Sequence, residues 1–292
     1  MVGTGIGPPG IDGSGRSGEV MTWRAPPPRR RRFSSWPPLP LVVLGSLGAA
    51  VFVLPLAGLL NAAPWGSMWS LLSAPEAGTA LRLSLLCSLS ATVLCVLLGV
   101  PLAWLLQRTN LPGRRLVRAV VTLPVVLPPV AGGVALLVVF GRRAALGRFI
   151  SDTLGINLFF STPGVILAET FVALPFLVLT MSGAMQGADT RLEEAARTFG
   201  AGRWTVFRRV TLPSVWPSLM AGTVLSWARA LGEFGATITF AGNLPGRTQT
   251  MPLAVYVALE TNPDAAVALS LVLVAVSLAV LVSLRRQWFR SL

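Results

Sequence analysis

The chain has 292 residues, of which 53% are hydrophobic and only 12% are charged, and its formal net charge is +13. This balance excludes an ordinary soluble domain and indicates an all-α membrane protein with several spans. The sequence holds no lysine and no histidine, so it cannot form a P-loop of the GxxxxGK[ST] type, and any ATP and Mg²⁺ that drive the protein must be bound by another subunit.

Residues 1–36 are rich in Gly, Pro, Ser and Arg and show no apolar periodicity, which predicts a disordered cytoplasmic tail. Residues 37–292 form the predicted transmembrane domain. Six stretches in it are long enough to cross a hydrocarbon core of about 30 Å, which takes roughly 20 helical residues. They are Leu39–Leu60, Leu81–Leu106, Val120–Phe140, Pro163–Ala184, Val215–Ala241 and Ala265–Leu284.

The arginines set the expected orientation. If the chain starts inside, the cytoplasmic segments hold sixteen arginines near the membrane, and the external loops hold four, namely Arg142, Arg143, Arg148 and Arg247. This bias predicts that both termini are cytoplasmic. The arginines lie between apolar segments without a nucleic-acid-binding motif beside them, so we do not expect nucleic-acid binding.

The second span contains both cysteines, Cys87 and Cys95. On one helix they are separated by about 12 Å of rise, which is beyond disulfide reach. We expect no metal site from such ligands and interpret both thiols as packing residues.

The third span is interrupted by a proline- and glycine-rich run, Leu123–Gly133. Such a run makes a poor continuous helix, and in membranes it survives where neighbouring helices or a cavity satisfy the freed backbone groups. Pro128, Pro129 and Gly132 are therefore candidates for lining a translocation path. A kink used only for packing is the alternative.

A polar loop, residues 186–213, joins the fourth and fifth spans. Thr190 followed by Glu193 has the form of a capping box at the start of a short helix. Gly200 lies where the chain needs a positive φ to leave that helix. The apolar residues of this helix share one face: Leu192, Ala195, Ala196 and Phe199.

A second short helix follows in the same loop. It carries Trp204 and Phe207 on one side and Arg203, Arg208 and Arg209 as its charged residues, and Pro213 should end it.

The loop resembles the EAA loop of the membrane subunits of bacterial ABC importers, on Glu194-Ala195-Ala196, Gly200 after three residues, and Val210-Thr211-Leu212-Pro213 after nine more. The one departure from the family pattern is Val210, where the family has Ile. In that family the loop is the coupling helix that seats in a groove of the ATPase subunit. The resemblance therefore implies an ATPase-coupling role for Glu193, Glu194, Ala195, Ala196, Gly200, Leu212 and Pro213. An ordinary amphipathic cytoplasmic loop is the alternative.

The fifth span carries Arg229 and Glu233, the two charges that stand clearly inside an apolar segment. Each charge costs roughly 2.5–3.5 kcal/mol at the centre of a membrane helix, so neither should face lipid. At i and i+4 the two side chains share a helix face. Gly232 and Gly235 would allow close approach of another helix, such as that of a symmetry mate.

Two interpretations of this segment stay open. The pair either fixes helix packing, or the segment is a gate at which Arg229 or backbone groups meet an anion in transit. The gate residues would be Arg229, Gly232, Glu233, Phe234 and Gly235.

The same region is similar to the permeases of molybdate, tungstate and sulfate importers, on Arg229–Ala236, Phe240–Asn243, Thr248–Thr250, Met251–Leu253 and, in the third span, Leu123–Pro129. The stretch after the fifth span resembles molybdate members more than sulfate members. The resemblance covers about residues 77–284. It implies a type I ABC importer fold and oxyanion import driven by ATP hydrolysis in a separate subunit, with molybdate ahead of sulfate, thiosulfate or tungstate.

The implied partners are an ATPase dimer, an extracytoplasmic solute-binding protein, a second copy of the chain and the lipid of the bacterial cytoplasmic membrane. The resemblance implies no cofactor in this chain. A rival interpretation is an ion-coupled secondary transporter, but that class usually shows internal repeats and ionisable residues in several spans.

Overall fold

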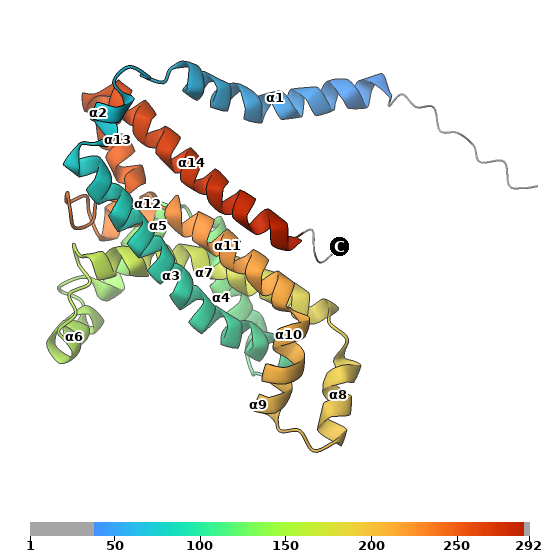
Figure 1. Ribbon diagram of the computed structural model, residues 1–292. Coiled ribbons are helices and arrows are strands. Elements are labelled where there is room, and N and C mark those ends of the chain that lie inside the picture. Colours follow the sequence, from blue (N-terminus) through green and yellow to red (C-terminus); the bar gives the residue numbers. More distant parts are fainter. Residues whose placement is uncertain (1–37, 289–292) are drawn as a thin grey trace, which may run out of the picture. The chain divides into compact units, whose positions relative to one another are not determined.

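In the computed structural model, the described residues, 38–288, form helices and connecting loops without a β-strand (Figure 1). The predicted disordered tail, residues 1–36, lies outside them. The chain divides into two compact units, Met1–Val53 and Leu54–Leu292. The described part of the first unit is the beginning of α1 (Leu39–Asn61), an apolar helix of 23 residues. All further packing belongs to the second unit.

Four of the described helices are long and apolar enough to cross a membrane: α1, α3 (Pro75–Arg108), α7 (Thr162–Gly187) and α14 (Pro263–Trp288). A fifth span results if α5 (Pro129–Phe140) and α6 (Ala145–Leu154), which are bent by 63° at their junction, count as one. The predicted all-α membrane architecture is confirmed.

The third predicted span, Val120–Phe140, is broken as its prolines indicate. Helix α4 (Arg114–Val126) ends before Leu127, and α5 begins at Pro129. Leu127 and Pro128 between them have extended backbone conformations, with ψ of 130° at both residues. Two successive prolines offer no N–H to a preceding turn, so the helix cannot run through them.

The fifth predicted span, Val215–Ala241, is wrong as a continuous helix. The chain forms α11 (Trp216–Leu231) and a separate short α12 (Gly235–Phe240). Gly232 ends the first helix, and the carboxylate of Glu233 accepts a hydrogen bond of 2.8 Å from the N–H of Ala236, which starts the second. The Glu233 side chain, which precedes the N-cap residue Phe234, therefore satisfies one of the first backbone N–H groups of α12.

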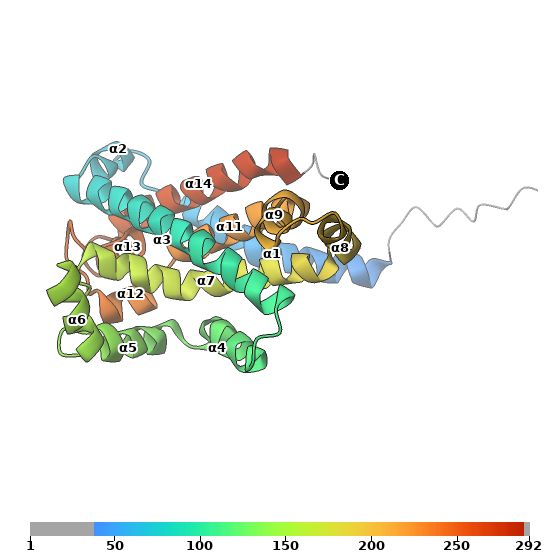
Figure 2. The ribbon, with the colours of Figure 1, turned by 90° about the horizontal axis from the view of Figure 1, so that it is seen from below.

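Helices α3, α7 and α11 form the centre of the second unit and lie side by side in both views (Figures 1 and 2). Small residues bring them together: a Cβ added at Gly99 of α3 or at Gly222 of α11 would lie 2.9 Å or 3.0 Å from the Leu177 side chain of α7. Such contacts are typical of membrane helix packing. Cys87 and Cys95 are buried and form no disulfide, and their burial agrees with the predicted packing role.

The two ends of this bundle differ. Short helices α2 (Met68–Leu72) and α13 (Met251–Thr261), together with α6, lie at one end, and α8 (Thr190–Thr198) and α9 (Arg203–Val206) lie at the other (Figures 1 and 2). The polar loop between α7 and α11 therefore projects from one end of the bundle. The three short helices at the opposite end, α2, α6 and α13, belong to segments that connect the predicted spans.

Candidate functional site

The first helix of the loop, α8, begins at Thr190, one residue earlier than a Thr190 N-cap would require. Asp189 is the N-cap, and its carboxylate accepts a hydrogen bond of 2.9 Å from the N–H of Arg191. The predicted Thr190–Glu193 capping box is wrong, since Thr190 is the first helical residue and the Glu193 carboxylate points elsewhere. An aspartate at this position still places negative charge at the positive end of the helix dipole.

The end of α8 has the geometry that the sequence predicts. Gly200 has a φ of +82°. Its N–H donates to the carbonyl of Arg197 at 2.9 Å, and the N–H of Ala201 donates to the carbonyl of Ala196 at 3.0 Å. This pair of bonds is a Schellman motif, in which a left-handed residue satisfies the last carbonyls of a helix. Gly200 therefore sets the direction in which the chain leaves α8.

The second half of the loop contains a π-helix. After α9, residues Phe207–Thr211 form the π-helical turn η1, and α10 (Leu212–Ser214) follows it. As predicted, Trp204 and Phe207 share a side and stack, with ring centroids 5.5 Å apart. Phe207 also contacts the edge of Trp104 on α3, with centroids 5.9 Å apart. Leu212 packs against the central core, and Pro213 is exposed.

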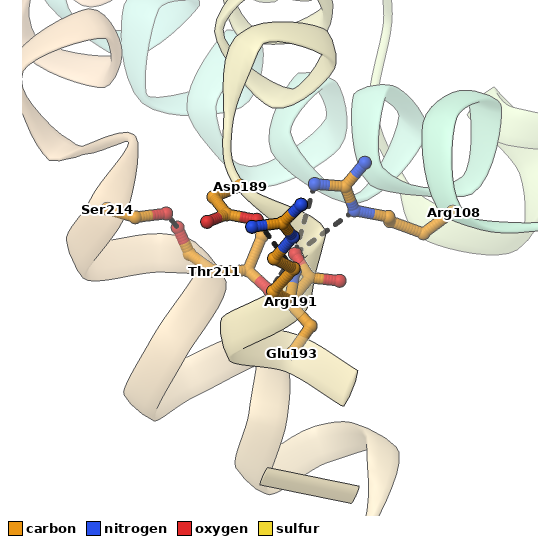
Figure 3. Close-up of polar contacts among 6 residues, drawn as sticks. All are labelled: Arg108, Asp189, Arg191, Glu193, Thr211 and Ser214. Atoms are coloured by element: carbon orange, nitrogen blue, oxygen red, sulfur yellow. Dashed lines mark hydrogen bonds and ion pairs between the residues drawn. The ribbon is translucent and has the colours of Figure 1, made fainter. Parts of the chain in front are cut away.

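Glu193 is the buried hub of the loop (Figure 3). Its Oε1 atom accepts a hydrogen bond of 3.1 Å from Nε of Arg108, at the end of α3, and lies 3.0 Å from Nη2 of the same arginine. The same oxygen accepts a hydrogen bond of 2.9 Å from the hydroxyl of Thr211, the last residue of η1. Ser214 in turn donates to the carbonyl of Thr211 at 2.7 Å. One carboxylate thus joins α8, η1 and α3, and we call Arg108, Glu193 and Thr211 the clamp.

Several other residues of the loop are exposed, and some of them are apolar. The side chains of Leu192, Phe199 and Trp204 are 59%, 92% and 71% exposed. Glu194 and Ala195 are exposed beside them, and Ala196 is half-buried. Exposed apolar residues of this size indicate an interaction surface, and we call Leu192, Phe199 and Trp204 the tip of the loop. The seven predicted coupling residues therefore separate: Glu193 and Leu212 face the protein, whereas Glu194 and Ala195 face outward.

The structure brings two of the predicted path segments together. A Cβ added at Gly235, the first residue of α12, would lie 3.0 Å from Cβ of Pro129, the first residue of α5. One turn on, a Cβ at Gly133 would lie 2.7 Å from Cβ of Thr239. Gly132 faces Phe171 of α7 instead. Gly235 thus permits the expected close helix approach, within this chain, between the two broken segments.

The charges of the broken segment form the expected pair. Arg229 and Glu233 make an i, i+4 ion pair, and the Glu233 side chain is 1% exposed against 26% for Arg229. Since the Glu233 carboxylate also accepts a hydrogen bond from the N–H of Ala236 in the first turn of α12, it stabilises the break between α11 and α12. Phe234, inside the break, packs against Tyr256 of α13 with ring centroids 5.3 Å apart. A Cβ added at Gly232 would have the carbonyl oxygen of Ala228, at 3.6 Å, as its one contact within 4 Å outside the adjacent residues.

Sequence reasoning missed a third ionisable side chain inside the bundle. Glu169 of α7 is 1% exposed, and its Oε2 atom accepts no hydrogen bond from any described residue. The expectation that Arg229 and Glu233 are the two ionisable residues clearly inside an apolar segment is therefore wrong. The signal was present, because Glu169 is the one acidic residue in the fourth predicted span, and a lone carboxyl in an apolar span is itself a functional signal. Among the described residues, no group of three or more His, Cys, Asp or Glu side chains is placed to hold a metal ion.

Comparisons with known proteins agree with this geometry. Residues 95–291 match the family of the binding-protein-dependent transport system inner membrane component. The chain is 48% identical over 237 residues to the molybdenum transport system permease protein ModB of Mycobacterium tuberculosis, covering 81% of this chain and 89% of that one. It is 44% identical to ModB of Escherichia coli K12, covering 70% and 91%.

Two further matches have lower sequence identity to this chain. The sulfate transport system permease protein CysT of Salmonella typhimurium is 35% identical, with 80% of this chain and 86% of that one covered. Among solved structures, a bacterial ABC transporter involved in the import of the acidic polysaccharide alginate superimposes with a TM-score of 0.68 at 18% identity, covering 86% of this chain and 94% of that one. At that identity the superposition shows a shared fold.

Proposed function

Because the chain belongs to the family of binding-protein-dependent transport system inner membrane components, we propose that it is the permease subunit of an ABC importer whose cargo is molybdate. The observation that carries the proposal is the loop between α7 and α11. It combines the family's spacing, from Glu194 to Pro213, with a fixed helix end at Gly200 and an exposed apolar tip.

The exposed tip is the docking surface for a separate ATPase. Phe199 and Trp204 are large aromatic side chains that cost little conformational entropy on binding, and such residues dominate interface energetics. ATP and Mg²⁺ bind on that partner, since a chain without lysine has no P-loop. The excess of arginines in this loop and in the other segments assigned to the same side supports a cytoplasmic position of the tip.

The complete importer contains two copies of this chain, two ATPase subunits and an extracytoplasmic solute-binding protein that delivers the oxyanion. Closure of the ATPases on ATP moves the two coupling loops and biases the bundle between its inward-open and outward-open arrangements. The gate lies where α12 meets the start of α5, at Gly235 and Pro129. Arg229 and Glu233 lie at the break between α11 and α12.

Molybdate is preferred to sulfate because the relatives named for molybdenum transport are 48% and 44% identical, against 35% for the sulfate permease. Both cargos are tetrahedral dianions, so selectivity lies mainly in the binding protein. Sulfate, thiosulfate and tungstate are the alternative cargos. An ion-coupled secondary transporter, the remaining alternative, would need no ATPase.

The test is uptake into proteoliposomes that contain the chain with its ATPase and with its binding protein supplied outside. We expect ATP-dependent uptake of labelled molybdate, which excess unlabelled molybdate abolishes. An equal concentration of sulfate should reduce uptake only slightly, because ~10-fold discrimination, about 1.4 kcal/mol, leaves sulfate a small share of the binding sites. Uptake by the chain without ATPase would support the secondary transporter. Equal competition by sulfate would reassign the cargo.

A further inference from the structure

We propose that Glu193 is a positioning residue that carries the movement of the coupling loop into α3 through Arg108. This inference rests on the proposed function, because it assigns a mechanical role within an ATP-driven importer. It separates two neighbouring acids that the sequence pattern treats alike: Glu194 serves the outer surface of the loop, and Glu193 serves its attachment to the membrane bundle.

The burial of the two carboxylates supports this division. Glu193 is 5% exposed, whereas Glu194, the next residue of the same helix, is exposed. A partner docked on the outer tip therefore reaches Glu194 directly and cannot reach Glu193. Ionised side chains that are removed from water are retained in a defined geometry only when charge and hydrogen bonds compensate them. Arg108, whose side chain is 11% exposed, supplies that compensation.

The donors on Glu193 come from separate segments. Arg108 Nε and Nη2 lie 3.1 Å and 3.0 Å from Oε1, and the hydroxyl of Thr211 lies 2.9 Å from the same atom. Charge-assisted bonds of this kind are the strong and directional ones. A rotation of α8 without α3 would have to break this ion pair, after which the Thr211 hydroxyl would be the one described donor left on the buried Glu193 carboxylate. The loop and the end of α3 are therefore expected to move together.

The clamp adds a connection that the main chain does not provide. Along the chain the loop is joined to α7 through Ala188 and to α11 through η1 and α10. Neither route includes α3, which the clamp reaches 85 residues away in sequence. Because α3 packs along both α7 and α11 in the central core, a pull on Arg108 is transmitted to all three helices. The edge contact of Phe207 with Trp104 lies on the same helix, one turn before Arg108.

The position of Thr211 fits this role. It is the last residue of the π-helical turn η1 and is 1% exposed. Short π-helical turns inside α-helices occur frequently at functional sites. Through Thr211 the clamp holds the two halves of the loop at a fixed spacing, so that force on α8 also reaches the start of α11.

The experiment measures two quantities on the complete complex in proteoliposomes: ATP hydrolysis and molybdate uptake. Glu193→Gln and Arg108→Gln remove the charge from each side of the pair. We expect ATP hydrolysis close to that of the unmodified complex and about tenfold less uptake per ATP, within the ~5–150-fold range of coupling between sites. The exposed Arg115 provides the matched control, and Arg115→Gln should leave the ratio unchanged.

Thr211 provides a milder and better matched pair of variants. Thr211→Ser keeps the hydroxyl that donates to Glu193 and should keep the uptake-to-hydrolysis ratio. Thr211→Val keeps the shape, removes the donor and should lower the ratio. The double variant Arg108→Glu with Glu193→Arg restores opposite charges and should recover a ratio above that of either single reversal, which is the signature of a direct interaction.

Three outcomes would overturn the inference: an unchanged ratio in Glu193→Gln and Thr211→Val, an equal loss of hydrolysis and uptake, or less ATPase co-purified with the clamp variants than with Arg115→Gln. The last two would make the clamp a structural or docking element. Failure of the proposed function is distinguishable, because the unmodified complex would then show no ATP-dependent uptake.

Discussion

Gly200 offers the sharpest perturbation of the coupling loop. Its φ of +82° lies in the left-handed region, and a Cβ built on it meets no atom within 4 Å. A side chain introduced there therefore costs free energy because of the left-handed backbone conformation, and not because of a steric clash. The left-handed conformation costs a residue with a Cβ roughly 1–2 kcal/mol, which shifts the equilibrium between the observed turn and alternatives about 5–30-fold. For a β-branched residue such as valine, the cost of this conformation should lie at or above the upper end of that energy range.

The matched control is Gly202, two residues further along the same loop. Its φ is −66°, and a Cβ added there also meets no atom within 4 Å. Gly200→Val should lower molybdate uptake per ATP hydrolysed in the reconstituted complex, with the protein still inserted and assembled, because α8 would leave its Schellman turn and redirect the docking tip. Gly202→Ala should change the ratio little, and Gly200→Asn should be intermediate, since asparagine tolerates the left-handed region.

Amide hydrogen exchange of Ala201 provides a second measurement, because this N–H bonds to the carbonyl of Ala196 only in the Schellman turn. Its protection should fall in Gly200→Val and persist in Gly202→Ala. Uptake per ATP at the unmodified level in Gly200→Val, with protection lost, would refute the reasoning and remove the helix end from the coupling mechanism.

Three further predictions concern docking, packing and gating. Phe199→Ala should weaken ATPase binding by at least ~10-fold, since truncation of an aromatic interface residue commonly costs about 2 kcal/mol or more; Trp69→Ala, which removes an 85% exposed tryptophan from α2, should not change it in a pull-down titration. Gly133→Ala places a Cβ 2.7 Å from Thr239 and should lower thermal stability by about 1–3 kcal/mol, whereas Gly183→Ala, in open space on α7, should be neutral or slightly stabilising. Glu233→Gln removes the ion pair to Arg229 and should raise ATP-independent leakage of anion from proteoliposomes more than it lowers expression; loss of folded protein without leakage would assign the pair to packing alone.

The parts of the fold that the sequence predicts are those governed by local rules. Apolar length predicts α1, α3, α7 and α14, and the positive φ at Gly200 follows from its place after an amphipathic turn. The break at Pro128 and Pro129 follows equally from the missing N–H groups. These features need no knowledge of what the segment packs against.

The errors arise where a side chain had two possible partners. Glu193 has the spacing of a capping-box residue, yet the distant Arg108 and Thr211 compete for its carboxylate, and Asp189 takes the N-cap instead. Glu233 was expected on a continuous helix, but its carboxylate also accepts from the N–H of Ala236 and so starts α12. Both outcomes depend on contacts that one-dimensional spacing does not encode.

The central claim is that the loop between α7 and α11 lies in the cytoplasm and is held by a separate ATPase. Thr205→Cys tests it most directly, because Thr205 is exposed in that loop and both native cysteines are buried. In intact cells the new thiol should resist a membrane-impermeant maleimide, and in inverted vesicles it should react with it and form a cross-link to the ATPase that depends on ATP. Labelling from outside the cell, or a complex that transports molybdate without any ATPase to cross-link, would contradict the account.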